Sequence, residues 1–314
     1  MIVSASYRTD IPAFHAAAFR ARLAAGYCDV KNPYGGKPAR VALRGPGVDG
    51  YVFWTRNAAP FGAALADIAA LGLPFVVQFT VTGYPRALDA HTVRAATAIA
   101  QIGTLARTYG ARAVVWRYDP VLLTSLTPPA WHRANFARLA AKMAGSVDEC
   151  IVSAAQMYRK TVRRLDRAAK QHGFDWIEPD PSIERALLVD LAAISSDFGI
   201  ATTVCSQPHL AAGALDAARC IDVGRLSDIA GRDIVAKTKG NRPGCLCAES
   251  RDIGAYDSCA HGCVYCYAVS DHDRAAARLQ QDGGSGQSAG APSLWASDSN
   301  ASTSSMGFSH SADE

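Results

Sequence analysis

Short apolar segments alternate with longer amphipathic segments about six times along this 314-residue chain. The apolar segments have the length and composition of buried strands, whereas the segments between them carry apolar residues at helical spacing. Such repeated alternation is typical of a parallel sheet whose strands are joined by right-handed helical crossovers. The expected strands span residues 2–7, 51–54, 75–81, 113–117, 150–154 and 201–205.

The expected helices begin and end at residues that favour helix termini. Asp10 and Pro12 fit the start of the first helix, and Gly26 fits its end. The six helices are predicted over residues 10–26, 60–72, 89–109, 128–145, 158–171 and 181–198. Residues 28–50 interrupt this rhythm with Gly- and Pro-rich turns around a short strand-like run, which predicts an inserted hairpin.

Polar residues gather on one face of several predicted strands, near the carboxyl ends. A parallel strand covered by helices on both sides is normally apolar on both faces. One-sided polarity therefore favours a parallel (β/α) barrel over residues 1–240, incomplete, with six or seven strands and a polar cavity at the strands' carboxyl ends. The residues that carry this pattern are Ser4, Ser6, Arg8, Asp10, Gln78, Thr80, Thr82, Arg117, Asp119, Thr203, Cys205 and Gln207.

Composition and charge narrow the class of protein. Hydrophobic residues make up 49% and charged residues 19% of the chain, which is typical of a globular protein. The net charge of +4 is mild, and the basic stretch 159–167 alternates with apolar residues at helical spacing. We interpret that stretch as a solvated helix face rather than a nucleic-acid contact.

The two ends of the chain give further expectations. The sequence starts directly with the strand-like Met1-Ile2-Val3, which predicts neither a signal peptide nor a membrane span, and hence a cytoplasmic protein. Residues 281–314 are rich in Gly, Ser, Ala, Asn and Asp, and are expected to form a disordered tail. Trp295 and Phe308 within this tail are interpreted as too isolated to contribute to a core.

Three cysteines near the end of the expected fold have the spacing of iron–sulfur ligands. Cys259, Cys263 and Cys266 form a C-x3-C-x2-C run, with Tyr265 just before the last cysteine. Three thiolates at this spacing can hold three irons of a 4Fe–4S cluster and leave the fourth iron open. The segment 241–272 is therefore predicted to bind such a cluster and to pack on the mouth of the barrel.

This run resembles the cluster motif of the radical S-adenosylmethionine (SAM) superfamily. The resemblance implies that SAM binds the open iron and that an electron from the cluster generates a 5′-deoxyadenosyl radical. It also implies an electron donor such as flavodoxin or ferredoxin, and it leaves open a small-molecule, peptide or nucleic-acid substrate. The motif lies near the end of the chain rather than near its start, which resembles a circular permutation. A Gly-Gly-Glu type segment for the SAM amino group is not evident.

The wider pattern resembles the bacterial family known as domain of unknown function 1848, over roughly residues 1–270. That resemblance implies a barrel-like body and a C-terminal cysteine cluster of the radical SAM type, but no named reaction. The segments that carry it are 6–10, 53–57, 78–83, 116–120 and 244–256, followed by the three-cysteine run.

The polar strand-end residues are candidates for binding SAM or substrate. Arg8 and Arg117 could bind a carboxylate, and Asp10 or Asp119 could accept hydrogen bonds from an amine or a ribose. Gln78 and Gln207 could contact adenine or substrate, while Ser6 and Thr80 lie on the same strand faces. Alternatively, Arg and Asp at each strand end could pair with one another.

The remaining cysteines leave alternatives open. Cys245 and Cys247 could ligate an auxiliary cluster or metal, supply a functional thiol, or only shape the loop; an auxiliary cubane would need Cys205, Cys220 or a partner chain. Otherwise Cys28, Cys150, Cys205 and Cys220 are expected in the core.

Three function classes follow: a radical SAM-type enzyme, a 4Fe–4S redox or sensor protein without SAM chemistry, and a barrel enzyme with a structural zinc ion.

Overall fold

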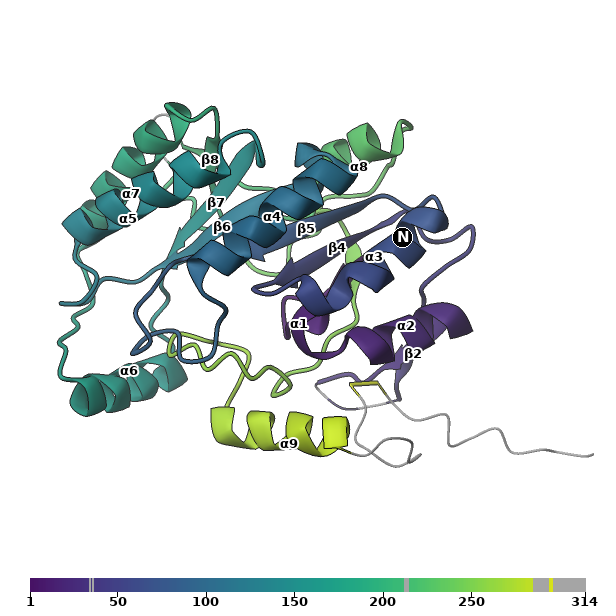
Figure 1. Ribbon diagram of the computed structural model, residues 1–314, viewed down its shortest axis with the longest axis horizontal. Helices are drawn as coiled ribbons and strands as arrows, with labels where there is room; N and C mark the ends of the chain where they lie inside the picture. The colour runs from purple at the N-terminus through teal and green to yellow at the C-terminus, as the bar shows by residue number, and fades with distance from the viewer. Residues whose placement is uncertain (34, 36, 212–214, 285–293, 296–314) are drawn as a thin grey trace, which may run out of the picture.

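Eight parallel strands form one sheet in the order β10-β1-β4-β5-β6-β7-β8-β9 (Figure 1). The computed structural model describes residues 1–33, 35, 37–211, 215–284 and 294–295. The strands of the sheet are β1 (Ile2–Ala5), β4 (Gly50–Thr55), β5 (Phe75–Thr80), β6 (Val114–Val121), β7 (Glu149–Ala154), β8 (Ala201–Val204), β9 (Asp216–Ala217) and β10 (Ser250–Asp252). The predicted parallel α/β fold is therefore confirmed.

The six predicted strands are all present, but the predicted total of six or seven is too low. The two additional strands, β9 and β10, form the two edges of the sheet and are only two and three residues long. β10 lies inside the cysteine-rich segment and pairs parallel with β1, with Ser4 opposite Asp252. The segment 241–272 thus adds an edge strand, β10, to the sheet next to β1.

The six predicted helices are present with two differences, and the described residues also form α8 and α9, which the sequence pattern did not predict. The predicted first helix is divided at His15, and the predicted third helix begins at Ala95 instead of residue 89. The expected hairpin is present as β2 (Tyr27–Val30) and β3 (Ala39–Ala42), which pair antiparallel. The helices are α1 (Ile11–Phe14), α2 (Ala16–Ala25), α3 (Gly62–Ala70), α4 (Ala95–Tyr109), α5 (Pro129–Met143), α6 (Arg159–His172), α7 (Pro181–Ser196), α8 (Val223–Ala230) and α9 (His272–Gly284), with short 3-10 helices η1 (Ala59–Phe61) and η2 (Ala111–Ala113).

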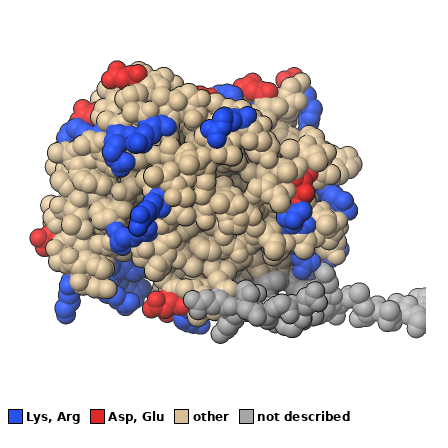
Figure 2. Space-filling view, in the orientation of Figure 1, with Lys and Arg blue, Asp and Glu red and all other residues tan. Residues whose placement is uncertain are grey.

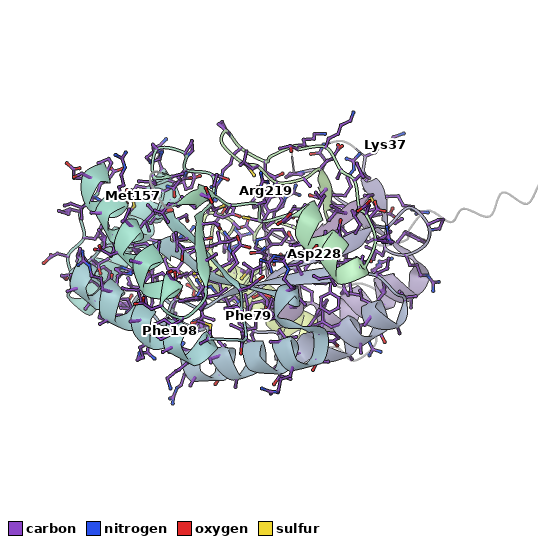
Figure 3. All side chains as sticks on the ribbon, turned by 90° about the horizontal axis from the view of Figure 1, so that it is seen from above. Lys37, Phe79, Met157, Phe198, Arg219 and Asp228 are labelled. Carbon is purple, nitrogen blue, oxygen red and sulfur yellow. The ribbon has the colours of Figure 1, made fainter. Side chains whose placement is uncertain are left out.

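The two faces of the sheet are covered differently. Helices α3, α4, α5 and α7 lie in front of the sheet in Figure 1, and they pack on a large apolar core that includes Phe53, Val77 and Trp116. The opposite face carries a smaller apolar cluster in which Val76 and Leu226 of α8 take part. Figure 3 shows side chains filling the space on both sides of the sheet.

This second face becomes polar toward the carboxyl ends of the strands. Ile2, Val52, Val76, Val115 and Ile151 are its buried apolar residues. The residues two positions further along three of these strands, Gln78, Arg117 and Ser153, are buried and polar. Since alternate residues of a strand share a face, the one-sided polarity seen in the sequence lies on this face.

The carboxyl-terminal part of the chain differs from the expectation of a fully disordered tail. Residues 281–284 belong to α9. Trp295 is 1% exposed, and its indole Nε1 donates to the Ile253 carbonyl at 2.8 Å. The interpretation of Trp295 as too isolated to join a core was therefore wrong. The rest of that predicted tail, residues 285–293 and 296–314 with Phe308, lies outside the described residues.

The surface agrees with a mild net charge. On the face shown in Figure 2, Lys and Arg side chains are separated by uncharged surface and interspersed with acidic groups. No helix in the part of the chain that the structure describes combines the length and hydrophobicity needed to cross a membrane.

The buried His132 generates a prediction about pH. Its ring bonds to the Tyr118 hydroxyl (2.8 Å) and the Leu122 carbonyl (3.1 Å), and burial lowers the pKa of His132 to about 4. The unfolded chain, with a histidine pKa of about 6.5, binds this proton more readily, so stability falls as the pH drops from about 6.5 to 4. Relative to His132→Gln, the wild type should lose about 3 kcal/mol more unfolding free energy over this range. Urea unfolding at pH 7 and pH 4 measures this, and equal losses in both proteins would contradict it.

Candidate functional site

A cavity of about 480 Å³ lies at the carboxyl ends of the strands. Residues from the ends of β4, β5, β6 and β7, and from the segments that follow β1 and β8, form one part of its wall. The segment after β9, through residue 268, forms the other part. Seven of the nine cysteines lie in this wall: Cys205, Cys220, Cys245, Cys247, Cys259, Cys263 and Cys266.

The three-cysteine loop is held against the loop that follows β5. The Val264 amide donates to the Leu88 carbonyl at 3.1 Å, and the His91 amide donates to the His261 carbonyl at 2.9 Å. Gly262 has a φ of +69°, and a Cβ at this position would lie 3.1 Å from the Cβ of Ala90. Glycine therefore permits both the left-handed turn and the close approach of the two loops. In Figure 1 this segment lies below the sheet, between α6 and α9.

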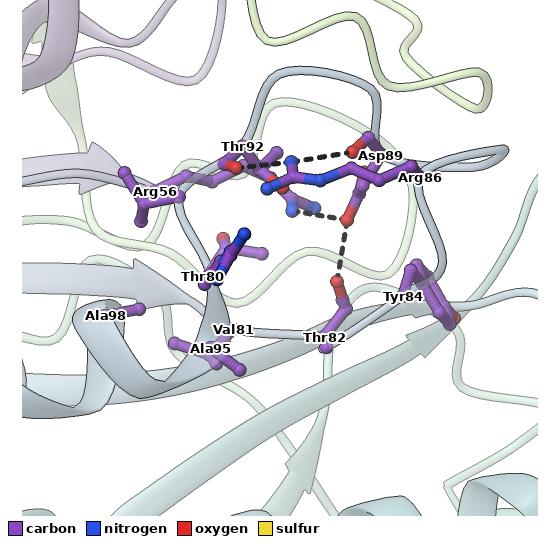
Figure 4. A pocket seen from close by; sticks show the side chains of 13 residues that line it. Arg56, Thr80, Val81, Thr82, Tyr84, Arg86, Asp89, Thr92, Ala95 and Ala98 are labelled. Atoms are coloured by element: carbon purple, nitrogen blue, oxygen red, sulfur yellow. Dashed lines mark hydrogen bonds and ion pairs between the residues drawn. The ribbon is translucent and has the colours of Figure 1, made fainter.

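A buried ion pair joins this loop to the sheet. Arg56, just after β4, donates from Nη1 to Oδ2 of Asp89 at 2.8 Å, and the Tyr265 hydroxyl donates to Oδ1 of the same carboxylate at 2.6 Å. Thr82 also donates to Asp89 at 2.9 Å. Figure 4 shows the contacts of Asp89 with Arg56 and Thr82, beside a smaller cavity of about 160 Å³. Asp89 is thereby held outside the helix predicted to begin there.

Arg164 of α6 holds the other end of the loop. Its Nη1 donates to the Cys266 carbonyl at 2.7 Å, and its Nη2 donates to the Val269 carbonyl. The basic stretch of α6 is therefore only partly the solvated face that its pattern predicts. Its partly buried arginine supports the backbone that carries the cysteines.

His261 and Asp10 connect the loop to the first helix. The His261 Nε2 lies 2.7 Å from Oδ2 of Asp10, whose two oxygens also accept from the amides of Ala13 and Arg56. Asp10 thus caps α1 and positions the loop, which leaves it little capacity for a ligand. The His261 Nδ1 is buried and has no hydrogen-bond partner among the described residues.

The protonation of the cysteines also depends on burial. Burial raises the pKa of the Cys259 and Cys263 thiols, so both are neutral thiols near pH 7 unless a metal replaces the proton. Within the described part of the chain, no group of three or more His, Cys, Asp or Glu side chains has the geometry of a preformed site for a metal ion. Any such site would therefore form with its metal.

Asp252 of β10 is a buried carboxylate that the sequence pattern did not single out. It accepts from the hydroxyls of Ser4 and Ser6, at 2.8 and 2.7 Å, and from two backbone amides. Burial raises the pKa of Asp252, although these hydrogen bonds and the Arg8 guanidinium, 3.7 Å away, oppose that rise. Its place in β10 was not predicted because the strand is only three residues long.

Most of the strand-end residues predicted to bind SAM or substrate line the cavity, and one does not. Ser6, Arg8, Asp10, Thr80, Arg117, Asp119 and Gln207 all line the cavity. Gln78 does not line it; its buried amide donates to the Cys220 carbonyl at 2.8 Å and accepts from Arg117 at 3.3 Å. The Gln207 amide bonds to the backbone of Ala154.

The sequence also allowed the Arg and Asp at each strand end to pair with one another, and the structure shows such a pair at the end of β6 only. Arg117 pairs with Asp119, and although burial alone raises the pKa of Asp119, the guanidinium makes the net shift downward. Arg8 pairs instead with Asp252 and lies 5.5 Å from the ring centres of Tyr7 and Tyr256.

Four further cysteines form a second group in the same wall. The sulfurs of Cys205 and Cys220 are 3.5 Å apart, and the Cys247 thiol interacts with those of Cys220 and Cys245. The hydrogen bond with the Cys247 thiol, helped by backbone amides and opposed by burial, lowers the pKa of Cys245 to about 5. Cys28 and Cys150 are buried in the main apolar core, as expected for structural cysteines.

These features define an α/β protein with a cysteine-lined cavity at the carboxyl ends of a parallel sheet. The chain belongs to the family described as Domain of unknown function (DUF1848), which matches residues 2–268. The matched range covers the whole sheet and both cysteine groups. No curated protein shows a significant match to the chain.

The Arg164 contacts generate a prediction about the cysteine loop. Arg164→Ala should leave the carbonyls of Cys266 and Val269 without their donor and destabilise the loop locally by about 1–3 kcal/mol. Hydrogen–deuterium exchange of residues 262–270 should then be faster than in wild type. Arg163→Ala, which removes an exposed arginine of the same helix, is the control. Equal exchange in the two variants would show that Arg164 does not hold the loop.

Proposed function

We propose that the protein is a radical SAM-type iron–sulfur enzyme, with a 4Fe–4S cluster bound by Cys259, Cys263 and Cys266. The observation that carries this proposal is the position of the three thiols in the wall of a cavity at the carboxyl ends of the strands, together with charged residues such as Arg8 and Arg117. Enzymes built on parallel α/β sheets have their active sites at this end. The sheet is accordingly interpreted as an incomplete barrel, with β9 and β10 as its two edges.

The donor set fits a cluster with one open position. The three thiols influence one another electrostatically, whereas the other four cavity cysteines interact among themselves. Three thiolates leave one iron without a cysteine. When bound, such a cluster would supply one electron to SAM, which is the chemistry that forms a 5′-deoxyadenosyl radical.

The chain's own groups would bind and orient the cofactor and the substrate. A cavity of about 480 Å³ lies within the range of about 300–1,000 Å³ that is typical of small-molecule sites. The Arg8 guanidinium, which lies near the rings of Tyr7 and Tyr256, could bind the carboxylate of SAM or of a substrate. Thr80 and the Arg117–Asp119 pair place further donors and acceptors in the same wall.

The cavity favours an enzyme over a redox or sensor protein, because electron transfer alone needs no pocket of this size. An electron donor such as flavodoxin or ferredoxin would reduce the cluster. The reducing cytoplasm suits an oxygen-sensitive cluster and free thiols. The zinc alternative is less well supported at the three-cysteine loop, because zinc knuckles usually have two C-x2-C-type pairs and a C-x3-C-x2-C run is unusual for them.

Metal analysis tests the cluster. Anaerobically purified protein should be brown and carry about four irons and four sulfides at this site. Each of Cys259→Ala, Cys263→Ala and Cys266→Ala should abolish the paramagnetic signal of the reduced cluster, because each removes one iron ligand. Cys28→Ala, which removes a core thiol that does not line the cavity, should retain it. Stoichiometric zinc without iron after anaerobic handling would refute the cluster.

A second experiment separates the enzyme from the redox alternative. Protein reduced with dithionite and supplied with SAM should release 5′-deoxyadenosine and methionine slowly, even without substrate. Arg8→Gln should weaken SAM binding about tenfold or more, because the guanidinium is the cavity group best suited to the SAM carboxylate. An intact cluster that neither binds nor cleaves SAM would support the redox or sensor function.

A further inference from the structure

Four thiols that lie far apart in the sequence meet on one side of the cavity. Cys205 follows β8, Cys220 follows β9, and Cys245 and Cys247 lie in the loop before β10. The sulfurs of Cys205 and Cys220 are 3.5 Å apart, and Cys247 interacts with both Cys220 and Cys245. We propose that these four thiolates bind a second metal centre, closed on all sides by protein ligands.

N–H groups around the sulfurs would stabilise thiolates once a metal has replaced the thiol protons. Arg117 Nη1 donates to the Cys220 sulfur at 3.1 Å, and Arg242 Nη2 donates to the Cys205 sulfur at 3.5 Å. The Ile221 amide donates to the Cys247 sulfur at 3.4 Å. Hydrogen bonds from N–H groups to sulfur are the outer-shell contacts that orient and stabilise metal-bound thiolates. Three separate donors thus face three of the four sulfurs, and the four thiols would close around the metal as it binds.

The charges are consistent with a bound cation. Four thiolates around a divalent ion leave a net charge of about −2. The guanidiniums of Arg117 and Arg242 offset this charge, although Asp119 shares Arg117. Without a metal, four neighbouring thiolates would repel one another, so Cys245 alone would be deprotonated near pH 7 and the other three thiols would keep their protons.

The backbone is shaped to present the last two cysteines. A Cβ at Gly240 would lie 2.3 Å from the Cys245 carbonyl oxygen and 2.5 Å from the Cys245 Cβ, so only glycine fits there. The Lys239 amide donates to the Cys247 carbonyl at 2.9 Å, and the Cys245 amide donates to the Arg242 carbonyl at 3.1 Å. These contacts shape the Cys-Leu-Cys segment, and the Ala248 amide, which donates to the Ile221 carbonyl at 3.0 Å, places it beside Cys220.

The ligand chemistry is that of a tetrathiolate, which either a single zinc ion or an iron–sulfur cluster can use. Around one tetrahedral zinc ion, with Zn–S bonds of about 2.3 Å, the sulfurs would be about 3.8 Å apart. The observed 3.5 Å is close to that spacing. Because all four positions are taken by protein, this centre would hold the cavity wall or transfer electrons, and it would not bind SAM.

The test removes the first site so that the second can be measured alone. The triple variant Cys259→Ala, Cys263→Ala, Cys266→Ala is purified anaerobically, and its zinc, iron and sulfide are determined. Either about one zinc or about four irons with four sulfides per chain should remain. Adding Cys205→Ser and Cys245→Ser should remove that metal, whereas adding Cys28→Ser and Cys150→Ser should not.

A second measurement covers the case in which the five-substitution variant does not fold. Titration of the folded triple variant with a mercurial should release the remaining metal as about four thiols react. Metal-free protein with reactive or disulfide-bonded thiols would overturn the proposal, as would metal that persists without Cys205 and Cys245. This result is independent of the three-cysteine cluster, because the triple variant lacks it.

Discussion

The buried ion pair between Arg56 and Asp89, joined by the Tyr265 hydroxyl, is the interaction on which the arrangement of the site depends. It connects the end of β4, the loop after β5 and the three-cysteine loop, which lie about 30 to 200 residues apart. The Asp89 carboxylate accepts hydrogen bonds from an arginine and two hydroxyl groups, whereas removing either Arg56 or Asp89 would leave an unpaired buried charge. The network therefore fixes the cysteine loop in one position against the strand ends.

The position of the cysteine loop follows from the path of the chain, which brings a segment near its end to the cavity beside the first strands. β10 lies beside β1, so the chain returns to its starting edge just before the three cysteines. Asp252 strengthens this junction by accepting from Ser4 and Ser6 across the paired strands. The same return passes residues 241–247 along the cavity wall, where Cys245 and Cys247 meet Cys205 and Cys220.

Sequence patterns were sufficient for the body of the fold, because long apolar strands and periodic helices carry strong local signals. They could not locate β9 and β10, whose two or three residues are strands only because a neighbour pairs with them. The helix predicted from residue 89 starts later, because Asp89 bonds to Arg56 instead of continuing a helix. Likewise, spacing alone indicated the three-cysteine loop. For Cys245 and Cys247 the sequence left several alternatives open, and only tertiary contacts show that Cys205 and Cys220 lie beside them.

The central claim is that the three-cysteine loop holds a cluster with one iron that no cysteine binds. Mössbauer spectroscopy of anaerobic protein loaded with ⁵⁷Fe tests this most directly, with the four-cysteine group removed by Cys205→Ser and Cys245→Ser. SAM should change the spectrum of one iron site in four and leave the other three unchanged. Four irons that are all insensitive to SAM would contradict it and would indicate a fully ligated redox cluster.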